Sequence, residues 1–190
     1  MQRISRRGFL AATSLTALAG CSALSSSGSQ NTGPLTIPTA DEQLPLPRDP
    51  SQLRQAARSG GPPKDGIPSI DAPTFVGRSE AGFLEPGDPV FGVVRDGEAK
   101  AYPQKILVQH EIVNDDLGGR PVSVTYCPLT GTVQGFLRGE TTFGVSGRLI
   151  NANLVMYDRE TESWWPQILA TSIPGAWNED PEIQSLQEFR

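Results

Sequence analysis

The sequence predicts an α+β, β-rich fold: a single small domain with a mixed or antiparallel sheet and one or two short helices. From about residue 65 onward, Gly and Pro recur every several residues, so the segments between them are short. Those segments are rich in β-branched and aromatic residues, which favour strands. Asp96-Gly97 separates two of them, and Asp-Gly readily takes the positive φ angles of a hairpin turn.

Residues 1–20 have the layout of an export signal, with three arginines, an apolar stretch at 8–19 and small residues before Cys21. Ser-Arg-Arg-Gly-Phe-Leu at 5–10 resembles the twin-arginine signature. Leu-Ala-Gly-Cys at 18–21 resembles a lipobox, whose cysteine is acylated. A membrane-spanning helix is the weaker alternative, because the apolar stretch is well short of about 20 residues. We therefore expect an exported protein whose partner is the membrane: a lipid on Cys21 anchors it to the outer face of the cell membrane.

Residues 21–64 are rich in Ser, Gly, Pro and Gln and show no sustained helical or strand period. This composition indicates a flexible tether between the lipid and the domain at 65–190. Within the tether, residues 49–59 favour a short helix capped by Asp49 or Ser51.

The charge of the chain argues against a nucleic-acid partner. Loss of Arg3, Arg6 and Arg7 with the signal takes the 16 basic residues to 13, against 21 acidic ones, so the net charge falls from -5 to -8. An acidic protein lacks the basic surface that binds phosphates.

The domain should contain several strands and one clear helix. Residues 103–108 predict the helix, because Pro103 suits a first-turn position. The predicted strands are 90–94, 99–102, 122–126, 133–137, 141–145 and 154–157.

Six short motifs in this region resemble a known family. They are DGIPSID (65–71), GEAKAYP (97–103), HEIVND (110–115), TYCPLTGT (125–132), FGVSG (143–147) and MYDRETESWW (156–165). In this order they resemble the family catalogued as domain of unknown function 3179, which is found in bacterial and archaeal envelope proteins. The resemblance covers residue 65 to the C-terminus and implies no established biochemical role.

The chain departs from the family pattern in two places. Many members have the sequence Cys-Pro-Leu-Cys, whereas this chain has Thr130 at the position of the second cysteine. A dithiol cycle within the motif is therefore not available. The family sequence usually continues after the segment that resembles residues 185–190, so a C-terminally truncated, inactive copy is one interpretation.

Cys127 and His110 are the candidate catalytic pair. With Cys21 acylated, Cys127 is the one free thiol, and His110 is the single histidine of the chain. A protonated imidazole beside the thiol would lower its pKa and make a nucleophile. The same pair could bind a soft metal, copper or zinc, with Met156 as a further ligand. The alternative is structural, since free cysteine is among the most buried residue types.

A second hypothesis is a non-catalytic module that binds a small ligand or a partner. Its candidate ligand-binding residues are Tyr126, Trp164, Asp158 and Arg159, with Asp158 and Arg159 either pairing or binding a polar ligand. The sequence leaves open whether the protein is an enzyme and which cofactor, if any, it uses.

Overall fold

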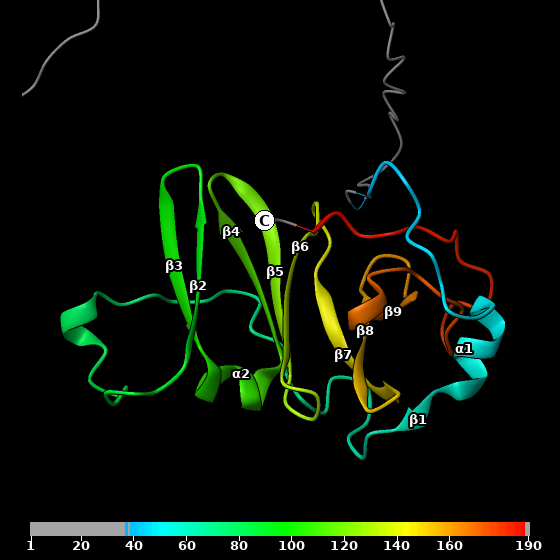
Figure 1. Ribbon diagram of the computed structural model, residues 1–190, viewed down its shortest axis with the longest axis horizontal. Helices are drawn as coiled ribbons and strands as arrows, with labels where there is room; N and C mark the ends of the chain where they lie inside the picture. Colours follow the sequence, from blue (N-terminus) through cyan, green and yellow to red (C-terminus); the bar gives the residue numbers. More distant parts are fainter. Residues whose placement is uncertain (1–36, 38, 189–190) are drawn as a thin grey trace, which may run out of the picture. The chain divides into compact units, whose positions relative to one another are not determined.

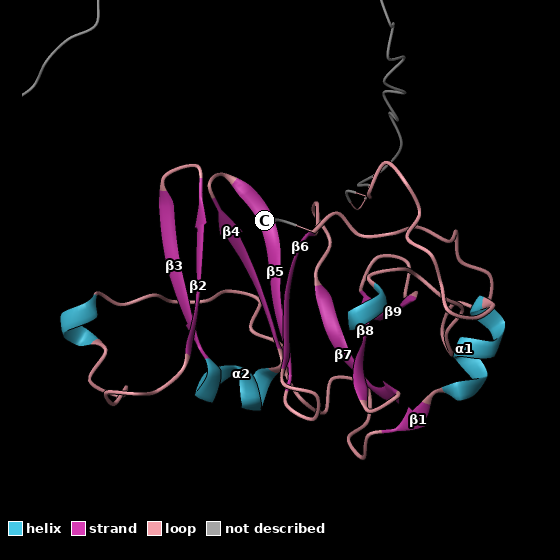
Figure 2. Cartoon of the chain, viewed as in Figure 1, coloured by secondary structure: helices cyan, strands magenta, loops and turns pink. Residues whose placement is uncertain are grey.

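The computed structural model describes residue 37 and residues 39–188. The predicted signal and Cys21 lie outside these residues. In the described part, β-strands dominate, and they form three small sheets accompanied by two short α-helices (Figures 1 and 2). The prediction of a small β-rich domain is confirmed, although one sheet was expected and the α+β label describes two seven-residue helices only loosely.

In chain order the elements are α1 (Pro50–Ala56), β1 (Arg58–Ser59), the 3-10 helix η1 (Arg78–Glu80), β2 (Val90–Arg95), β3 (Glu98–Pro103), α2 (Gln104–His110), β4 (Ile112–Leu117), β5 (Arg120–Cys127), β6 (Thr132–Leu137), β7 (Phe143–Ile150), β8 (Asn153–Asp158), β9 (Trp164–Pro166) and the 3-10 helix η2 (Gln167–Leu169). The sheets have the strand orders β2-β3, β4-β5-β6 and β1-β7-β8-β9, and their strand pairs are antiparallel.

The three-stranded sheet is the middle layer, between the β2-β3 hairpin with α2 and the four-stranded sheet (Figure 1). Successive side chains of a strand point to opposite faces. Val124 and Tyr126 therefore join a hydrophobic cluster with Tyr102 of β3 and Leu107 of α2. Cys127 faces the other way and packs with a second cluster, which includes Phe143, Val145, Met156 and Trp165. Burial of β5 on both faces makes it the centre of the fold.

Asn114 of β4 joins the middle sheet to the four-stranded sheet. Its side chain has no exposed surface, and its Oδ1 accepts hydrogen bonds from Phe143 N (3.0 Å) and Ser123 Oγ (2.6 Å). Its Nδ2 donates to Phe143 O (2.9 Å) and Asp71 Oδ1 (2.6 Å). The amide thus pairs with Phe143 as a neighbouring strand would, and all its hydrogen-bonding capacity is used.

Residues 50–59 pack against the folded domain, although the sequence predicts a tether that extends to residue 64. Asp49 caps α1 as expected, accepting a hydrogen bond from Ser51 N (2.9 Å). Leu53 is 3% exposed, and β1 pairs with β7. The buried Leu53 supplies the apolar contact that holds this segment to the domain, although most of the residues around it in the sequence are polar.

Most predicted elements agree with the structure within a few residues, but β1, β4 and β9 were not predicted as strands. β4 contains Asn-Asp-Asp, residue types that are depleted in strands. Here Asn114 is paired as described above, and Asp115 accepts hydrogen bonds from Lys100 and Tyr102. Tertiary partners therefore override a poor local propensity.

The described residues include no helix that is both long enough and apolar enough to span a bilayer.

Replacement of Asn114 tests its role in joining the two sheets. Asn114→Ala removes the side-chain partner of Phe143 N and leaves Phe143 O with the Arg159 guanidinium at 3.3 Å. We therefore expect a loss of about 3 kcal/mol in the free energy of unfolding, measured by urea denaturation. Asn178→Ala is the matched control, because Asn178 also donates two hydrogen bonds but is half-buried, and it should cost about 1 kcal/mol or less. Equal effects of the two substitutions would contradict the assigned role.

Candidate functional site

The thiol of Cys127 lies inside the core. Strand β5 ends at this residue, which is 1% exposed, and its Sγ lies 3.6 Å from Ala152 O. The proposed metal ligand Met156 belongs to the same hydrophobic cluster and has no exposed surface. The structure therefore brings these two sulfur atoms into one apolar cluster, where a thiol packs as a small hydrophobic group.

His110 is the last residue of α2, and its Nδ1 lies 2.8 Å from Pro68 O. Within the described part of the chain, no hydrogen bond joins its imidazole to Cys127. The β4-β5 register would place residue 110 opposite residue 127, since Ile112 pairs with Thr125, but the chain leaves the ladder at Glu111 to form α2. The imidazole is then directed to the Pro68 segment instead of the thiol.

Glu111 makes the turn between α2 and β4 with a positive φ of 59°, which is uncommon for a residue other than glycine. Burial raises the pKa of its carboxyl to about 7. Across the residues that the structure describes, no group of three or more His, Cys, Asp and Glu side chains is arranged to hold a metal ion.

Asp158 and Arg159 have partners other than each other. The buried Asp158 carboxylate accepts hydrogen bonds from Thr161 Oγ1 (2.7 Å) and Trp165 Nε1 (2.8 Å), so it closes the loop before β9. The Arg159 guanidinium forms ion pairs with Asp65 (3.3 Å) and Asp71 (3.4 Å). These contacts fix the ends of the loops and the segment at 65–71.

The Arg159 network includes Tyr157, whose hydroxyl donates a hydrogen bond to Asp65 Oδ2. Burial, followed by the hydrogen bond to Asp65, raises the pKa of Tyr157 to about 12. A side chain at Gly144 would come within 2.5 Å of the Tyr157 ring, so only glycine fits there. Three motifs that are far apart in the sequence, 65–71, 143–147 and 156–165, therefore meet in one polar network.

The predicted aromatic binding residues do not share a surface. Tyr126 packs with Phe91 at a ring-centroid distance of 5.4 Å and receives a hydrogen bond from Gln104 Nε2. Trp164 is 5% exposed and lies in a different hydrophobic cluster, where it contacts Trp177 at 6.0 Å. Both side chains serve the core.

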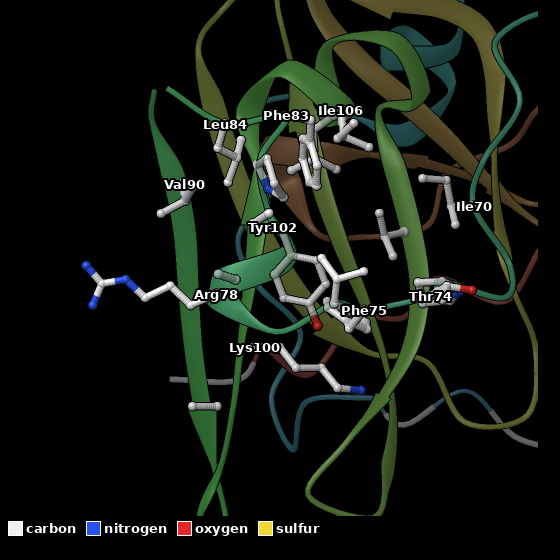
Figure 3. A pocket seen from close by; sticks show the side chains of 18 residues that line it. Ile70, Thr74, Phe75, Arg78, Phe83, Leu84, Val90, Lys100, Tyr102 and Ile106 are labelled. Carbon is white, nitrogen blue, oxygen red and sulfur yellow. The ribbon is translucent and has the colours of Figure 1, made fainter. Parts of the chain in front are cut away.

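An apolar cavity of about 640 Å³ lies between β3, α2 and the segment 70–84 (Figure 3). Its size is within the range of small-molecule sites, about 300–1,000 Å³. Apolar and aromatic side chains from all three elements line it, among them Ile70, Phe75, Phe83, Leu84, Tyr102 and Ile106. Sequence reasoning missed this site, because the lining residues of the segment 70–84 precede the first predicted strand and show no period.

Phe75 and Phe83 hold the outer wall of the cavity to the rest of the domain. The Phe75 ring packs edge-on against Tyr102, with 5.6 Å between centroids, and the Lys100 ammonium lies 4.8 Å from its centroid. The Lys105 ammonium on α2 donates to Phe83 O (2.9 Å) and pairs with Asp88. Despite these contacts the two rings remain 40% and 50% exposed.

Lys100 and Tyr102 line the polar end of the cavity, and both are bonded to Asp115 behind them. Lys100 Nζ lies 3.1 Å from both Asp115 carboxylate oxygens and 3.2 Å from Glu98 Oε1, and the Tyr102 hydroxyl donates to Asp115 Oδ2 (2.8 Å). Lys100 and Tyr102 are two residues apart in the predicted strand 99–102, and this spacing indicates that their side chains lie on the same face. The motifs 97–103 and 110–115 therefore meet here.

Burial of Cys127 leads to a prediction for its reactivity. In the full chain carrying Cys21→Ala, iodoacetamide should label Cys127 only in denaturant, because the folded thiol is shielded from the reagent. Mass spectrometry measures the labelling rate between pH 6 and 9, and His110→Ala should leave it unchanged. Labelling of the folded protein at low pH that His110→Ala suppresses would instead show a working thiolate.

Comparison with known proteins identifies a family. The family model described as "Protein of unknown function (DUF3179)" matches residues 64–190. No curated protein and no solved structure matches the chain. The matched region holds the cavity, the Arg159 network and the buried Cys127. Since it spans more than half of the sequence, the chain belongs to the DUF3179 family.

Proposed function

We propose that this protein is an exported lipoprotein, anchored to the outer face of the cell membrane through Cys21, and that its DUF3179 domain binds a small apolar molecule. The binding site is the cavity between β3, α2 and the segment 70–84, and the module is non-catalytic. The observation that carries the proposal is the apolar lining of a cavity of about 640 Å³ that is open to its surroundings.

The exposed aromatic and aliphatic side chains around the cavity support a binding role. Phe75, Val76, Phe83 and Val90 are 40%, 51%, 50% and 46% exposed, and all four line the same cavity. Single exposed apolar residues need no explanation, but a contiguous group marks a surface that another molecule covers. A ligand that removes this area from water gains about 25 cal/mol for each Å² of apolar surface.

The contacts around Cys127 give the thiol hypothesis less support. The sulfur lies on the face of β5 opposite the cavity, in the cluster with Met156 and Phe143. His110 is engaged with Pro68 O, as described above. A bound molecule in the cavity therefore meets Tyr102 and Leu107 and does not reach the thiol.

The export and anchoring part of the proposal is supported by the sequence, through the arginine pair at 6–7, the apolar stretch at 8–19 and Cys21. A single acyl chain gives reversible membrane binding, and stable anchoring takes a second one. The ligand site would then be displayed outside the cell, close to the membrane surface.

Substitution of the lipobox cysteine tests the anchor. Cys21→Ala should move the full chain from the membrane fraction to the soluble fraction of a host with twin-arginine export, as measured by immunoblotting after ultracentrifugation. Cys127→Ala is the control, and this variant should remain with the membranes because its lipid is retained. If the Cys21→Ala protein stays in the membrane fraction, lipid attachment at this residue is not what anchors it.

Filling the cavity tests ligand binding. The full chain carrying Cys21→Ala should bind the uncharged fluorophore N-phenyl-1-naphthylamine with increased emission, and Ala81→Trp should weaken this binding at least tenfold because Ala81 lines the cavity. Phe75→Ala is a second variant that removes apolar contact without adding bulk, with an expected weakening of about threefold to tenfold.

Ala176→Trp is the matched control for the cavity variant, since Ala176 is exposed and does not line this cavity. It should leave the dissociation constant unchanged. Circular dichroism should show the same fold for the variants and the parent chain. Equal binding by the parent, Ala81→Trp and Phe75→Ala proteins would exclude the cavity as the site.

A further inference from the structure

Lys100, one of the two charged residues that line the cavity, is already paired with acidic groups beside it. The side chain of Lys100 is 17% exposed, and its ammonium donates to Asp115, Asp116 O (2.5 Å) and Glu98. Its three protons therefore have three protein acceptors. An anionic ligand group that entered the cavity would find no free donor on this lysine.

Asp115 is equally saturated. Its Oδ2 accepts from Lys100 and from the Tyr102 hydroxyl, and its Oδ1 accepts from Lys100 and from Asp116 N (2.8 Å). The carboxylate is 8% exposed. A cationic ligand group would therefore have to displace an existing partner before it could pair with Asp115.

The charge state of this network is fixed at neutral pH. Burial lowers the pKa of Lys100, but the hydrogen bonds to Asp115 and Glu98 outweigh it and raise the pKa above its ordinary value. Burial, followed by the hydrogen bond to Asp115, raises the pKa of Tyr102 well above its usual range. At neutral pH the lysine is therefore charged and the tyrosine neutral.

Arg78 is the other basic residue that lines the cavity. Its side chain extends away from Phe75 and Tyr102 at the centre of the site (Figure 3). Within the described residues, no ion pair or hydrogen bond holds the Arg78 guanidinium. An anionic head group could reach it only by remaining at the edge, outside the apolar interior.

We propose that the cavity selects uncharged, hydrocarbon-rich molecules and rejects fatty-acid-like anions, an inference that rests on the binding function proposed above. A charge of either sign loses its hydration on entry and gains no partner, which costs far more than the transfer of apolar surface gains. A group the size of a water molecule occupies about 30 Å³. The cavity volume of about 640 Å³ therefore accommodates roughly 20 non-hydrogen atoms. The ligand is thus a single chain or a fused-ring molecule of that size.

A matched pair of fluorescent probes tests this selectivity. N-Phenyl-1-naphthylamine is uncharged, and 8-anilino-1-naphthalenesulfonate has the same aromatic skeleton with a sulfonate added. On the full chain carrying Cys21→Ala, the uncharged probe should bind at least tenfold more tightly at pH 7, and Ala81→Trp should weaken it. Dodecanol should displace it at lower concentrations than dodecanoate does.

Arg78→Gln separates this inference from the general binding function, with Arg148→Gln, an exposed arginine outside the cavity, as the control. Arg148→Gln should leave the binding of the uncharged probe unchanged. Sulfonate binding as tight as that of the uncharged probe, lost in Arg78→Gln and in Ala81→Trp, would overturn the selectivity while the binding function stands. Failure of both probes to bind, or indifference of both to Ala81→Trp, would overturn both proposals.

Discussion

The fold depends on one buried amide. The Asn114 side-chain amide makes the hydrogen bonds that the backbone of a neighbouring strand would make. It accepts from Phe143 N and donates to Phe143 O, and so connects the four-stranded sheet to the three-stranded one. Its remaining donor reaches Asp71, which also pairs with Arg159, so the amide aligns two sheets and one of the segments packed on them. A buried polar group of this kind is worthwhile only when all of its partners are in place, because each missing partner leaves a desolvated atom. The packing of the two sheets on each other therefore relies on this amide.

The two faces of β5 have different tasks. One face packs against β7 and β8, where Cys127, Phe143 and Met156 have almost no exposed surface, and this side supplies the dry core. The other face carries Val124 and Tyr126, which support α2 and the β2-β3 hairpin and hence the floor of the cavity. Alternation along one strand thus separates the stabilising contacts from the binding contacts. The same alternation explains why the thiol, which looks reactive in the sequence, lies on the side away from the cavity.

The sequence was most informative where local chemistry decides the structure. The hairpin around Asp96-Gly97, the Asp49 cap and the family motifs were all recognisable from short stretches. It was least informative where distant residues decide: β4 is a strand because Lys100, Tyr102 and Phe143 satisfy its polar side chains, and no local pattern shows those partners. The pairing of His110 with Cys127 was suggested by their presence in neighbouring motifs, but the positive φ at Glu111 turns the chain before the two residues can face each other. The cavity itself arises from an irregular segment, whose position no periodicity encodes.

The irregular segment that walls the cavity should have a lower local stability than the sheets. Between Asp71 and Pro89 the regular structure is limited to η1, and the hydrogen bonds there run mainly between residues three apart, such as Leu84 N to Ala81 O and Asp88 N to Glu85 O. Between the two ends of the segment, its contacts to the remainder of the domain include the Phe75 ring on Tyr102 and Lys100, and the Lys105 bonds to Phe83 O and Asp88. Opening this wall breaks those contacts while the sheets and Asn114 stay intact, so it is a sub-global event with a free energy well below that of complete unfolding. Its amides should exchange with solvent early, and the same local opening would widen the cavity for a ligand larger than its resting shape accepts.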